Sequence, residues 1–497
     1  MSYDLLIVGS GPVGSTYAHV VSQRLPDARI LMVDAGPVLT DPPGLNLKNL
    51  EDEEAVRRAR EQSQGPPGAP VGDAGIPHVE GTITARQGTH LVEPRGAGMP
   101  AAAVSTCVGG MGAHWTCATP RPHGSERIPF VPGEELDAAL ASAERLLATT
   151  SMAFAESPQG AAIRTRLAAR FDAELPDGRK VGILPVAGRV DDGRVRWTGV
   201  DTLLEPLLAS ETFELRAETL CRELVVHGDR VTAAALEHRP TGAREEVEAT
   251  AIVVAADSLR TPQLLWASGI RPPALGRYLT EHPLTFAVAV LDPDRIPPLA
   301  AERPRPHDPV MSVITVPFSE PRHPYHAQVM HVERVPFPLP GLVEVDAPAG
   351  LATMGWGFRK WPRADDWVEF TDERQDPFGM PAMTIHYELG DRELSEQERA
   401  LENLWRAGTA LGAFPPGGEP RVMPKGSSLH YMGTIRMGES DDGTSVCDAW
   451  SRVWDFENLF VGGNGVIPTA NACNPTLTSV ALAARSCERV VAALTPR

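Results

Sequence analysis

The 497-residue sequence contains no apolar run long enough to cross a bilayer, and its N-terminus lacks the basic-then-apolar pattern of a secretory signal. It also lacks a Lys- or Arg-rich tract, and its formal net charge of −18 argues against a nucleic-acid partner. Cysteine is scarce, with six residues and no CxxC or Cys/His metal-ligand spacing. We therefore expect a cytoplasmic protein with free thiols, no membrane partner and no bound metal.

The chain is longer than one hydrophobic core normally holds, so we expect two closely joined domains. At residues 251–270 an apolar strand leads through a turn into a helix, which repeats a β-to-α step found at the N-terminus. Between 284 and 423, strand-like segments such as 284–291 and 310–316 alternate with Pro-rich turns, as in an antiparallel sheet. The predicted fold class is α/β: a Rossmann-like dinucleotide-binding domain joined to an α+β domain built on an antiparallel sheet.

The predicted boundaries give the dinucleotide-binding domain residues 1–284, completed by 425–497, and the substrate-binding domain residues 285–424. Residues 40–98 form a loop-rich insertion, in which the Gly- and Pro-dense stretch 65–77 is expected to be a flexible loop. Ser395 and Glu398 have the spacing of a capping box at a helix start. Apolar periodicity and helix breakers predict the other helices at 51–64, 134–150, 157–173, 262–269 and 475–494.

The strongest motif is at the N-terminus, where an apolar strand at residues 5–8 runs directly into three glycines and a helix. Gly9 permits the tight turn, Gly11 lets a pyrophosphate approach the backbone, and Gly14 lets the helix pack on the strand. A second apolar strand ends at Asp34, where an acid can accept hydrogen bonds from ribose hydroxyls. The helix N-terminus also offers free N–H groups to phosphates. Together these features predict a dinucleotide site, against the alternative of an ordinary glycine turn.

A second glycine-rich stretch spans residues 105–120 and includes Gly109, Gly110 and Gly112, followed by His114, Trp115 and Thr116. Glycine at this density usually marks close approach of the backbone to a ligand or to another chain segment. The alternative is an irregular surface loop. Large ring side chains in the middle of small ones favour the ligand interpretation.

Two polar residues near the C-terminus are candidates for chemistry. His430 lies between a Ser-rich turn and a glycine, and histidine is the usual base for a hydroxyl proton at neutral pH. Asn474 directly precedes the last predicted helix, and its neutral amide can hold a substrate oxygen without competing for the proton. Each has an alternative: a structural histidine at 430, and for Asn474 the N-cap of a helix with Pro475 in its first turn. The two roles of Asn474 are compatible, because the positive end of a helix also stabilises an anionic group.

These residues lie in strings that resemble the glucose–methanol–choline (GMC) oxidoreductases, most closely the pyranose oxidases and their bacterial glycoside-oxidising relatives. The most specific string, His-Trp-Thr-Cys-Ala-Thr-Pro120, is similar to pyranose oxidases rather than to the wider family. Asp257 departs from the family pattern, which usually has a small residue there. The other strings are Gly-Ser-Gly-Pro-Val-Gly14, Thr-Pro-Gln-Leu-Leu-Trp-Ala-Ser-Gly-Ile270, Gly-Arg-Tyr-Leu-Thr-Glu-His-Pro283, Asp-Pro-Phe-Gly-Met-Pro381, His-Tyr-Met-Gly-Thr-Ile-Arg-Met-Gly438 and Asn-Pro-Thr-Leu-Thr478.

The resemblance implies the fold of the GMC enzymes and of p-hydroxybenzoate hydroxylase, with FAD on the N-terminal glycine turn and its isoalloxazine ring between the domains. It implies His430 as the base, Asn474 as its partner and Gln328 as a sugar-contacting residue. In pyranose oxidases the histidine matching His114 can carry the flavin covalently, whereas bacterial relatives vary. Thr116 matches a threonine close to flavin N5. The other implied cofactor contacts are Gly109, Gly110, Gly112, Asn464, Pro475 and Thr476.

The activity that the resemblance implies is oxidation of a secondary ring hydroxyl, at C2 or C3, of a pyranose sugar or glycoside to a ketosugar. Dioxygen, reduced to hydrogen peroxide, or a quinone is the expected electron acceptor. The alternatives are a GMC enzyme acting on a non-sugar alcohol such as a sterol, and an NAD(P)-dependent reductase or dinucleotide-binding regulator. A pure interaction module is the least favoured. The chain is shorter than the fungal members, so their tetramer does not carry over, and the oligomeric state stays open.

Overall fold

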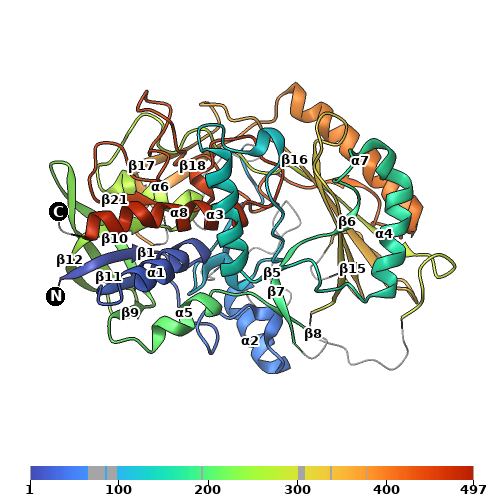
Figure 1. Ribbon diagram of the computed structural model, residues 1–497, viewed down its shortest axis with the longest axis horizontal. Helices are drawn as coiled ribbons and strands as arrows, with labels where there is room; N and C mark the ends of the chain where they lie inside the picture. The colour runs from blue at the N-terminus through green and yellow to red at the C-terminus, as the bar shows by residue number, and fades with distance from the viewer. Residues whose placement is uncertain are drawn as a thin grey trace.

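Two bodies lie side by side along the long axis of the molecule, one holding both chain ends and the other carrying α4 and α7 (Figure 1). The computed structural model describes residues 2–64, 84–86, 98–191, 194–299, 308–335, 339–376 and 378–495. The loop predicted at 65–77 lies outside these residues.

The first body is built on a parallel sheet centred on β1 (Tyr3–Val8), whose residues Leu5, Leu6 and Ile7 are fully buried. Strands that are covered on both faces need such unbroken apolar runs. β1 pairs in parallel with β2 (Ile30–Val33) and with the second half of β12 (Ala243–Val254). β9 (Phe213–Arg216) extends the sheet beyond β2, and β21 (Leu459–Val461) extends it beyond β12. The first half of β12 belongs to an antiparallel meander with β11 (Arg230–His238) and β10 (Thr219–His227).

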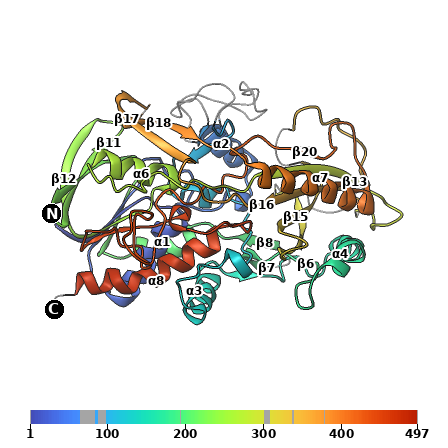
Figure 2. The same cartoon turned by 90° about the horizontal axis from the view of Figure 1, so that it is seen from above.

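Helices cover both faces of this parallel sheet. α1 (Pro12–Arg24), α8 (Thr476–Leu494) and α3 (Gly133–Leu146) pack together on one side (Figure 2). α6 (Asp257–Ala267) lies on the other side, beside β10. This arrangement is the predicted Rossmann-like domain, and it brings the N-terminal glycine turn next to the last helix of the chain.

The second body is the predicted antiparallel sheet, and the predicted bounds of two of its strands, β13 (Leu284–Leu291) and β14 (Val310–Val316), are confirmed. The strand order is β13, β16 (Leu351–Phe358), β15 (Tyr325–Val332) and β14. One face packs on α7 (Asp391–Leu411) and α4 (Pro158–Phe171), and its core includes Trp356 and Phe358. α4 and β6 (Gly182–Ile183), the strand beside β14, come from the N-terminal part of the chain, so residues outside 285–424 complete this core.

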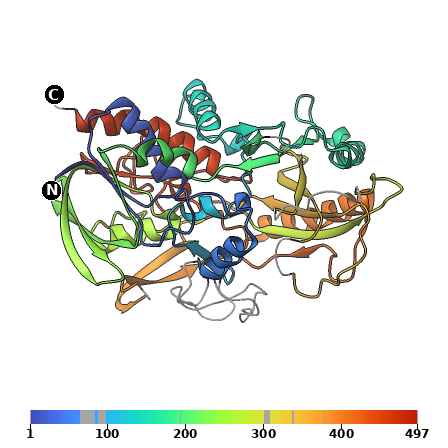
Figure 3. The same ribbon diagram turned by 90° about the horizontal axis from the view of Figure 1, so that it is seen from below.

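The hairpin of β17 (Trp367–Gln375) and β18 (Pro381–His386), orange in Figure 3, packs beside α6 and not on the second sheet. The remaining elements are β3 (Thr84–Arg86), β4 (Ala103–Ser105), β5 (Thr149–Thr150), β7 (Val186–Asp191), β8 (Arg194–Trp197), β19 (Gly412–Ala413), β20 (Arg421–Val422), α2 (Glu53–Gln64), α5 (Asp201–Leu208), and the 3-10 helices η1 (Leu47–Asn49), η2 (Gly110–Ala113), η3 (Gly124–Glu126), η4 (Asp172–Glu174) and η5 (Asn464–Val466).

The prediction that α6 begins near Pro262 is wrong, because the helix starts at Asp257 and contains Pro262. Asp257 has φ +69°, and its Oδ1 accepts hydrogen bonds from the N–H groups of Leu259 and Arg260, so this side chain caps the helix. Pro262 has no N–H to donate to the carbonyl of Ser258, four residues earlier. The Thr434 hydroxyl donates to that carbonyl at 2.5 Å instead. A donor distant in sequence therefore allows the proline inside the helix.

The predicted capping box at Ser395 and Glu398 is also wrong. α7 starts one turn earlier, at Asp391, where the Glu393 carboxylate accepts the N–H of Gly390 at 3.0 Å. Gly390 and Ser395 are each followed three residues later by a glutamate, Glu393 and Glu398. The sequence favoured Ser395 as the helix start because a serine side chain can cap a helix and glycine has no side chain.

No helix among the described residues has the length and apolar character to cross a membrane. Within the same residues no group of three or more His, Cys, Asp or Glu side chains is arranged to hold a metal ion. All six cysteines are free thiols and all are buried.

Replacing Thr434 with valine should lower the melting temperature, because it leaves the buried Ser258 carbonyl without this donor. An unsatisfied buried polar group of this kind costs about 1–3 kcal/mol. Thr409→Val is the matched control, since the exposed Thr409 hydroxyl bonds the Trp405 carbonyl on the surface of α7 and should be nearly neutral. Differential scanning fluorimetry of the two holoproteins makes the comparison. Equal melting temperatures would contradict the role given to Thr434.

Candidate active site

The glycine turn after β1 leaves open space at one of its three glycines. Gly9 has φ +102°, and a Cβ there would lie 2.4 Å from the Ala255 carbonyl oxygen, so only glycine fits. A Cβ on Gly14 would lie 2.0 Å from the Gly9 carbonyl oxygen, so glycine lets α1 pack on β1. For Gly11 the nearest atom to a Cβ is 3.9 Å away. The chain itself does not require glycine at residue 11, as expected where a phosphate approaches the backbone.

Asp34 turns its carboxylate toward this glycine turn. Its Oδ2 accepts hydrogen bonds from the N–H (3.1 Å) and the hydroxyl (2.6 Å) of Ser10, and its Oδ1 accepts one from the Gly36 N–H at 2.9 Å. Burial raises the pKa of Asp34 to about 6, and these hydrogen bonds oppose the rise. Asp34 therefore stabilises the turn, and its contact with a ribose stays a prediction.

The second glycine-rich stretch lies directly against the first. The Gly109 N–H donates to the Ser10 hydroxyl at 2.9 Å. A Cβ on Gly110 would lie 3.5 Å from the Gly11 Cα, and one on Gly112 would lie 3.0 Å from Pro12 Cγ. Two segments about a hundred residues apart thus form one cradle at the N-terminus of α1, where free N–H groups and the helix dipole favour an anion such as a pyrophosphate.

His114 and Thr116 follow this cradle. His114 is partly exposed, and its Nε2 lies 3.8 Å from the Cys107 sulfur. Thr116 is exposed. Burial raises the pKa of the Cys107 thiol to about 12, so this sulfur remains protonated beside His114.

The other predicted cofactor residues lie around the start of α8. Asn464 begins η5, and its Oδ1 accepts a hydrogen bond from the Ser479 hydroxyl in the first turn of α8 at 2.7 Å. Pro475 is buried, and Thr476, the first residue of α8, is partly exposed. The first backbone N–H groups of a helix have no partner within it, so this end is suited to a ligand acceptor.

His430, Asn474 and Gln328, far apart in the sequence, lie together between the two bodies. The Asn474 Nδ2 is 3.3 Å from the His430 Nε2, and the Asn474 Oδ1 accepts a hydrogen bond from the Gln328 Nε2 at 2.5 Å. Gln328 lies on β15 of the second sheet, so both bodies contribute to this group. The alternative that Asn474 caps the last helix is wrong, since the N-cap residue of α8 is Pro475 and the Asn474 amide is turned to His430 and Gln328.

Two further histidines at this site were missed from the sequence. The His282 Nδ1 lies 3.0 Å from the His430 Nδ1, with the ring planes at 66°. His326 lies on β15, two residues before Gln328, and therefore on the same face of the strand. Two features of the sequence could have pointed to them. His282 precedes Pro283 in one of the family strings, and His326 lies two residues before Gln328, the spacing of neighbours on one face of a strand.

Two buried carboxylates hold the loops that carry the catalytic candidates. The Glu281 carboxylate accepts hydrogen bonds from the Gly426 N–H (2.6 Å) and the Ser428 hydroxyl (3.0 Å), just before His430. The Glu126 Oε1 accepts from the N–H groups of Ala472 (2.8 Å) and Cys473 (3.0 Å), just before Asn474. Burial raises the pKa of both carboxyls, that of Glu281 to about 7. Each loop is thus held in place one or two residues before its candidate side chain.

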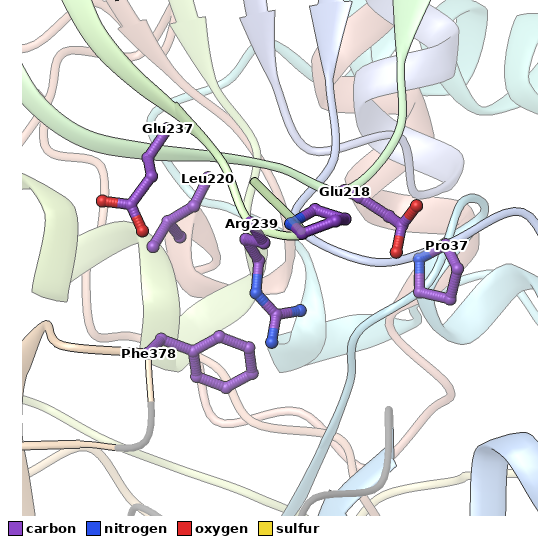
Figure 4. A pocket seen from close by; sticks show the side chains of 7 residues that line it. Pro37, Glu218, Leu220, Glu237, Arg239 and Phe378 are labelled. Carbon is purple, nitrogen blue, oxygen red and sulfur yellow. The ribbon is translucent and has the colours of Figure 1, made fainter. Parts of the chain in front are cut away.

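A surface pocket lies elsewhere, beside the segment that follows Asp34 (Figure 4). The Arg239 guanidinium lies 4.4 Å above the Phe378 ring and donates to the Ala35 carbonyl at 2.9 Å. None of the pocket's residues belongs to the His430 group. They are Pro37, Glu218, Leu220, Glu237, Arg239, Pro240 and Phe378.

The chain is similar to a known protein family and to several known proteins. Two family models, both described as GMC oxidoreductase, match residues 128–284 and 362–483. The chain is 43% identical to a C-glycoside 3-oxidase of Microbacterium trichothecenolyticum, over 99% of this chain and 97% of that protein. It is 32% identical to a pyranose 2-oxidase of Tricholoma matsutake, over 99% of this chain and 94% of that protein.

Among solved structures, pyridoxine 4-oxidase from Mesorbium loti is similar to this chain, with a TM-score of 0.63 and 98% of both chains covered. At 19% sequence identity this similarity shows the shared fold alone.

Gly11→Ala should leave the protein folded but weaken dinucleotide binding by at least about tenfold, because the added methyl group enters space that only a ligand would use. Gly9→Ala should instead reduce soluble expression, since its methyl group would collide with the Ala255 carbonyl. The measurements are flavin absorbance per protein and the circular dichroism spectrum. A Gly11→Ala protein with full flavin content would show that no phosphate approaches this residue.

Proposed function

The chain belongs to the GMC oxidoreductase family, and from that premise we propose that it oxidises a secondary ring hydroxyl of a pyranose sugar or glycoside to a ketone. The C-glycoside 3-oxidases are more similar to this chain than the pyranose 2-oxidases, which favours the C3 hydroxyl over C2. The family depends on FAD. The cradle of Gly11 and Gly109, open at the N-terminus of α1, suits the FAD pyrophosphate.

The observation that carries the proposal is the pairing of Asn474 with His430, joined to Gln328 of the second sheet. An alcohol oxidase needs a base that takes the hydroxyl proton and a neutral group that fixes the oxygen. The imidazole and the amide supply these two functions, 3.3 Å apart at their nearest nitrogens. Gln328 extends the polar group into the body proposed to bind the sugar.

The hydrogen-bond chain through this group supports Nε2 as the nitrogen of His430 that acts as the base. Gln328 donates to the Asn474 Oδ1, so the Asn474 amide nitrogen faces His430 as a donor. The His430 Nε2 must then accept, which leaves the proton on Nδ1. That proton is donated to the His282 Nδ1, 3.0 Å away. The Nε2 lone pair of His430, which here faces the Asn474 amide, would accept the substrate proton once a substrate hydroxyl takes the place of that donor.

The protonation states agree with this role. Burial lowers the pKa of His430 to about 4, that of His326 to about 3, and that of His282 well below its usual range. A group whose pKa is lowered stays neutral at every pH above the new value. His430 is therefore an unprotonated base from about pH 4 upward, and the surrounding imidazoles add no positive charge.

When bound, FAD supplies the isoalloxazine ring that accepts a hydride from the substrate carbon. His430 takes the hydroxyl proton at Nε2, and Asn474 donates to the same oxygen and orients it. The imidazolium so formed, together with the N-terminus of α8 two residues after Asn474, stabilises negative charge that develops at the site. A covalent link to the cofactor through His114 is part of the proposal, as is dioxygen, or alternatively a quinone, as the final electron acceptor.

The test is product analysis of the yellow holoenzyme incubated with glucose, an O-glycoside and a C-glycoside, with hydrogen peroxide measured in parallel. The expected product is a 3-ketosugar. Oxidation of a sterol but of no sugar would reject the substrate class.

His430→Ala should keep FAD and lower the rate of anaerobic flavin reduction by at least about a thousandfold.

In the wild type, kcat/KM should stay level from neutral pH down to about 4 and then fall tenfold per pH unit, because protonated His430 cannot act as a base.

His282→Leu should slow flavin reduction at least about tenfold, with little change in KM, because the His430 Nδ1–H then has no acceptor and the ring can exchange its tautomer. His282→Asn offers a carbonyl acceptor and should recover part of the rate. The acid limb of the pH profile should also move in the leucine variant, a change that loss of packing alone does not produce. Equal rates and equal pH profiles for both variants would remove His282 from this role.

A further inference from the structure

Strand β16 carries two glycines, Gly355 and Gly357, on the face of the second sheet that bears Gln328 and His326. In the sheet register Gly355 lies opposite Gln328, and Gly357 lies opposite His326. Directly opposed residues of antiparallel strands project to the same face. Trp356, between the two glycines, belongs to the core on the other face, under α4 and α7. The site-facing side of β16 therefore has no side chain at these two positions.

Neither glycine is required by the backbone or by packing. Neither has a left-handed φ. A Cβ on Gly355 would meet only Leu284 Cδ1, at 3.5 Å. One on Gly357 would meet His282 Cβ at 3.5 Å and the carbonyl oxygens of Ala472 and His326 at 3.8 Å, all ordinary contacts. The strand glycine Gly188 is different, since its Cβ would lie 2.9 Å from the Arg196 carbonyl oxygen. Glycine inside a strand is unfavourable, and where no strain explains it, close approach of a ligand is a usual reason.

Two buried polar atoms on the same face point independently to a ligand. The His326 Nε2 and the Thr315 hydroxyl have no hydrogen-bond partner among the described residues, and their residues are 5% and 8% exposed. The Asn474 side chain also lies close enough to the His326 ring to raise its pKa against the effect of burial. Thr315 lies opposite Gln328 on β14, so all these groups border one patch of the sheet. Buried polar atoms almost always find a partner. A ring carrying several hydroxyls, each able to donate and accept, supplies such partners.

We propose that Gly355 keeps this patch clear for the pyranose ring, with His326 and Thr315 binding its hydroxyls, so that the missing side chain on β16 limits the size of the glycoside accepted. The inference rests on the proposed function and deepens it. Gln328 binds the ring next to Asn474, and Gly355 lets the ring lie close to the strand, whereas Gly357 packs against His282 and the Ala472 carbonyl. The apolar side chains of Leu284 and Phe286, opposite the glycines on β13, border the patch on its far side.

The test compares Gly355→Ala, Gly355→Val and the control Gly133→Ala. Gly133 is exposed at the start of α3, and its Cβ would meet only Arg127 Nη2, at 3.8 Å. KM for glucose and for the glycosides should rise about tenfold or more in the valine variant and less in the alanine variant, most for the bulkiest glycoside. Melting temperature and flavin content should not fall, and the control should match the wild type throughout. His326→Leu should raise KM in the same assays.

The failures of the two proposals are distinguishable. A wild-type enzyme that oxidises no sugar would reject the proposed function. A wild type that oxidises sugars while Gly355→Val keeps its KM values would reject the inference alone, and so would a lower melting temperature in Gly355→Ala. If Gly355→Val does not fold, calorimetric titration of glucose into His430→Ala and into His430→Ala with Gly355→Ala measures binding without turnover. Equal affinities there would also overturn the inference.

Discussion

The hydrogen-bond chain from Gln328 through Asn474 and His430 to His282 is the interaction on which the rest of this structure depends. It joins a strand of the second sheet to the three segments that carry His282, His430 and Asn474. The two middle members, Asn474 and His430, both donate and accept, so the orientation of the amide sets the tautomer of the imidazole. The chain can form only when both bodies are in place, which links the integrity of the fold to the chemistry of one imidazole nitrogen.

Keeping these groups neutral requires a site with little water, and the buried carboxylates show how the fold tolerates such a site. Burial is the largest influence on the pKa values of Asp34, Glu126 and Glu281, and it raises all three. Each carboxylate is compensated by backbone N–H or hydroxyl donors from a loop that it holds. The hydrogen bonds that compensate the burial of these acids are thus the same ones that position the glycine cradle and the two loops that carry His430 and Asn474.

Much of the architecture could be predicted from short-range pattern, because a strand buried on both faces or a glycine turn is encoded within about ten residues. The bounds of β13 and β14 follow from apolar runs alone. His430 and Asn474 were found by residue type and family strings. The start of α6 was missed because the donor that replaces the missing proline N–H is Thr434, far away in sequence. His282 and Glu126 were missed for the same reason: their roles exist only through contacts between distant segments.

The two bodies handle their ligands by opposite means. In the first body, glycines at residues 9 and 14 are dictated by the chain itself, and only Gly11 leaves space. In the second sheet, neither glycine facing His326 and Gln328 is required by a left-handed backbone or by a close contact. The proposed cofactor cradle thus depends on glycines that cannot be replaced, whereas the proposed substrate patch at Gly355 has room for a small side chain. Specificity in this fold can therefore change at β16 without disturbing the hydrogen-bond chain that carries the chemistry.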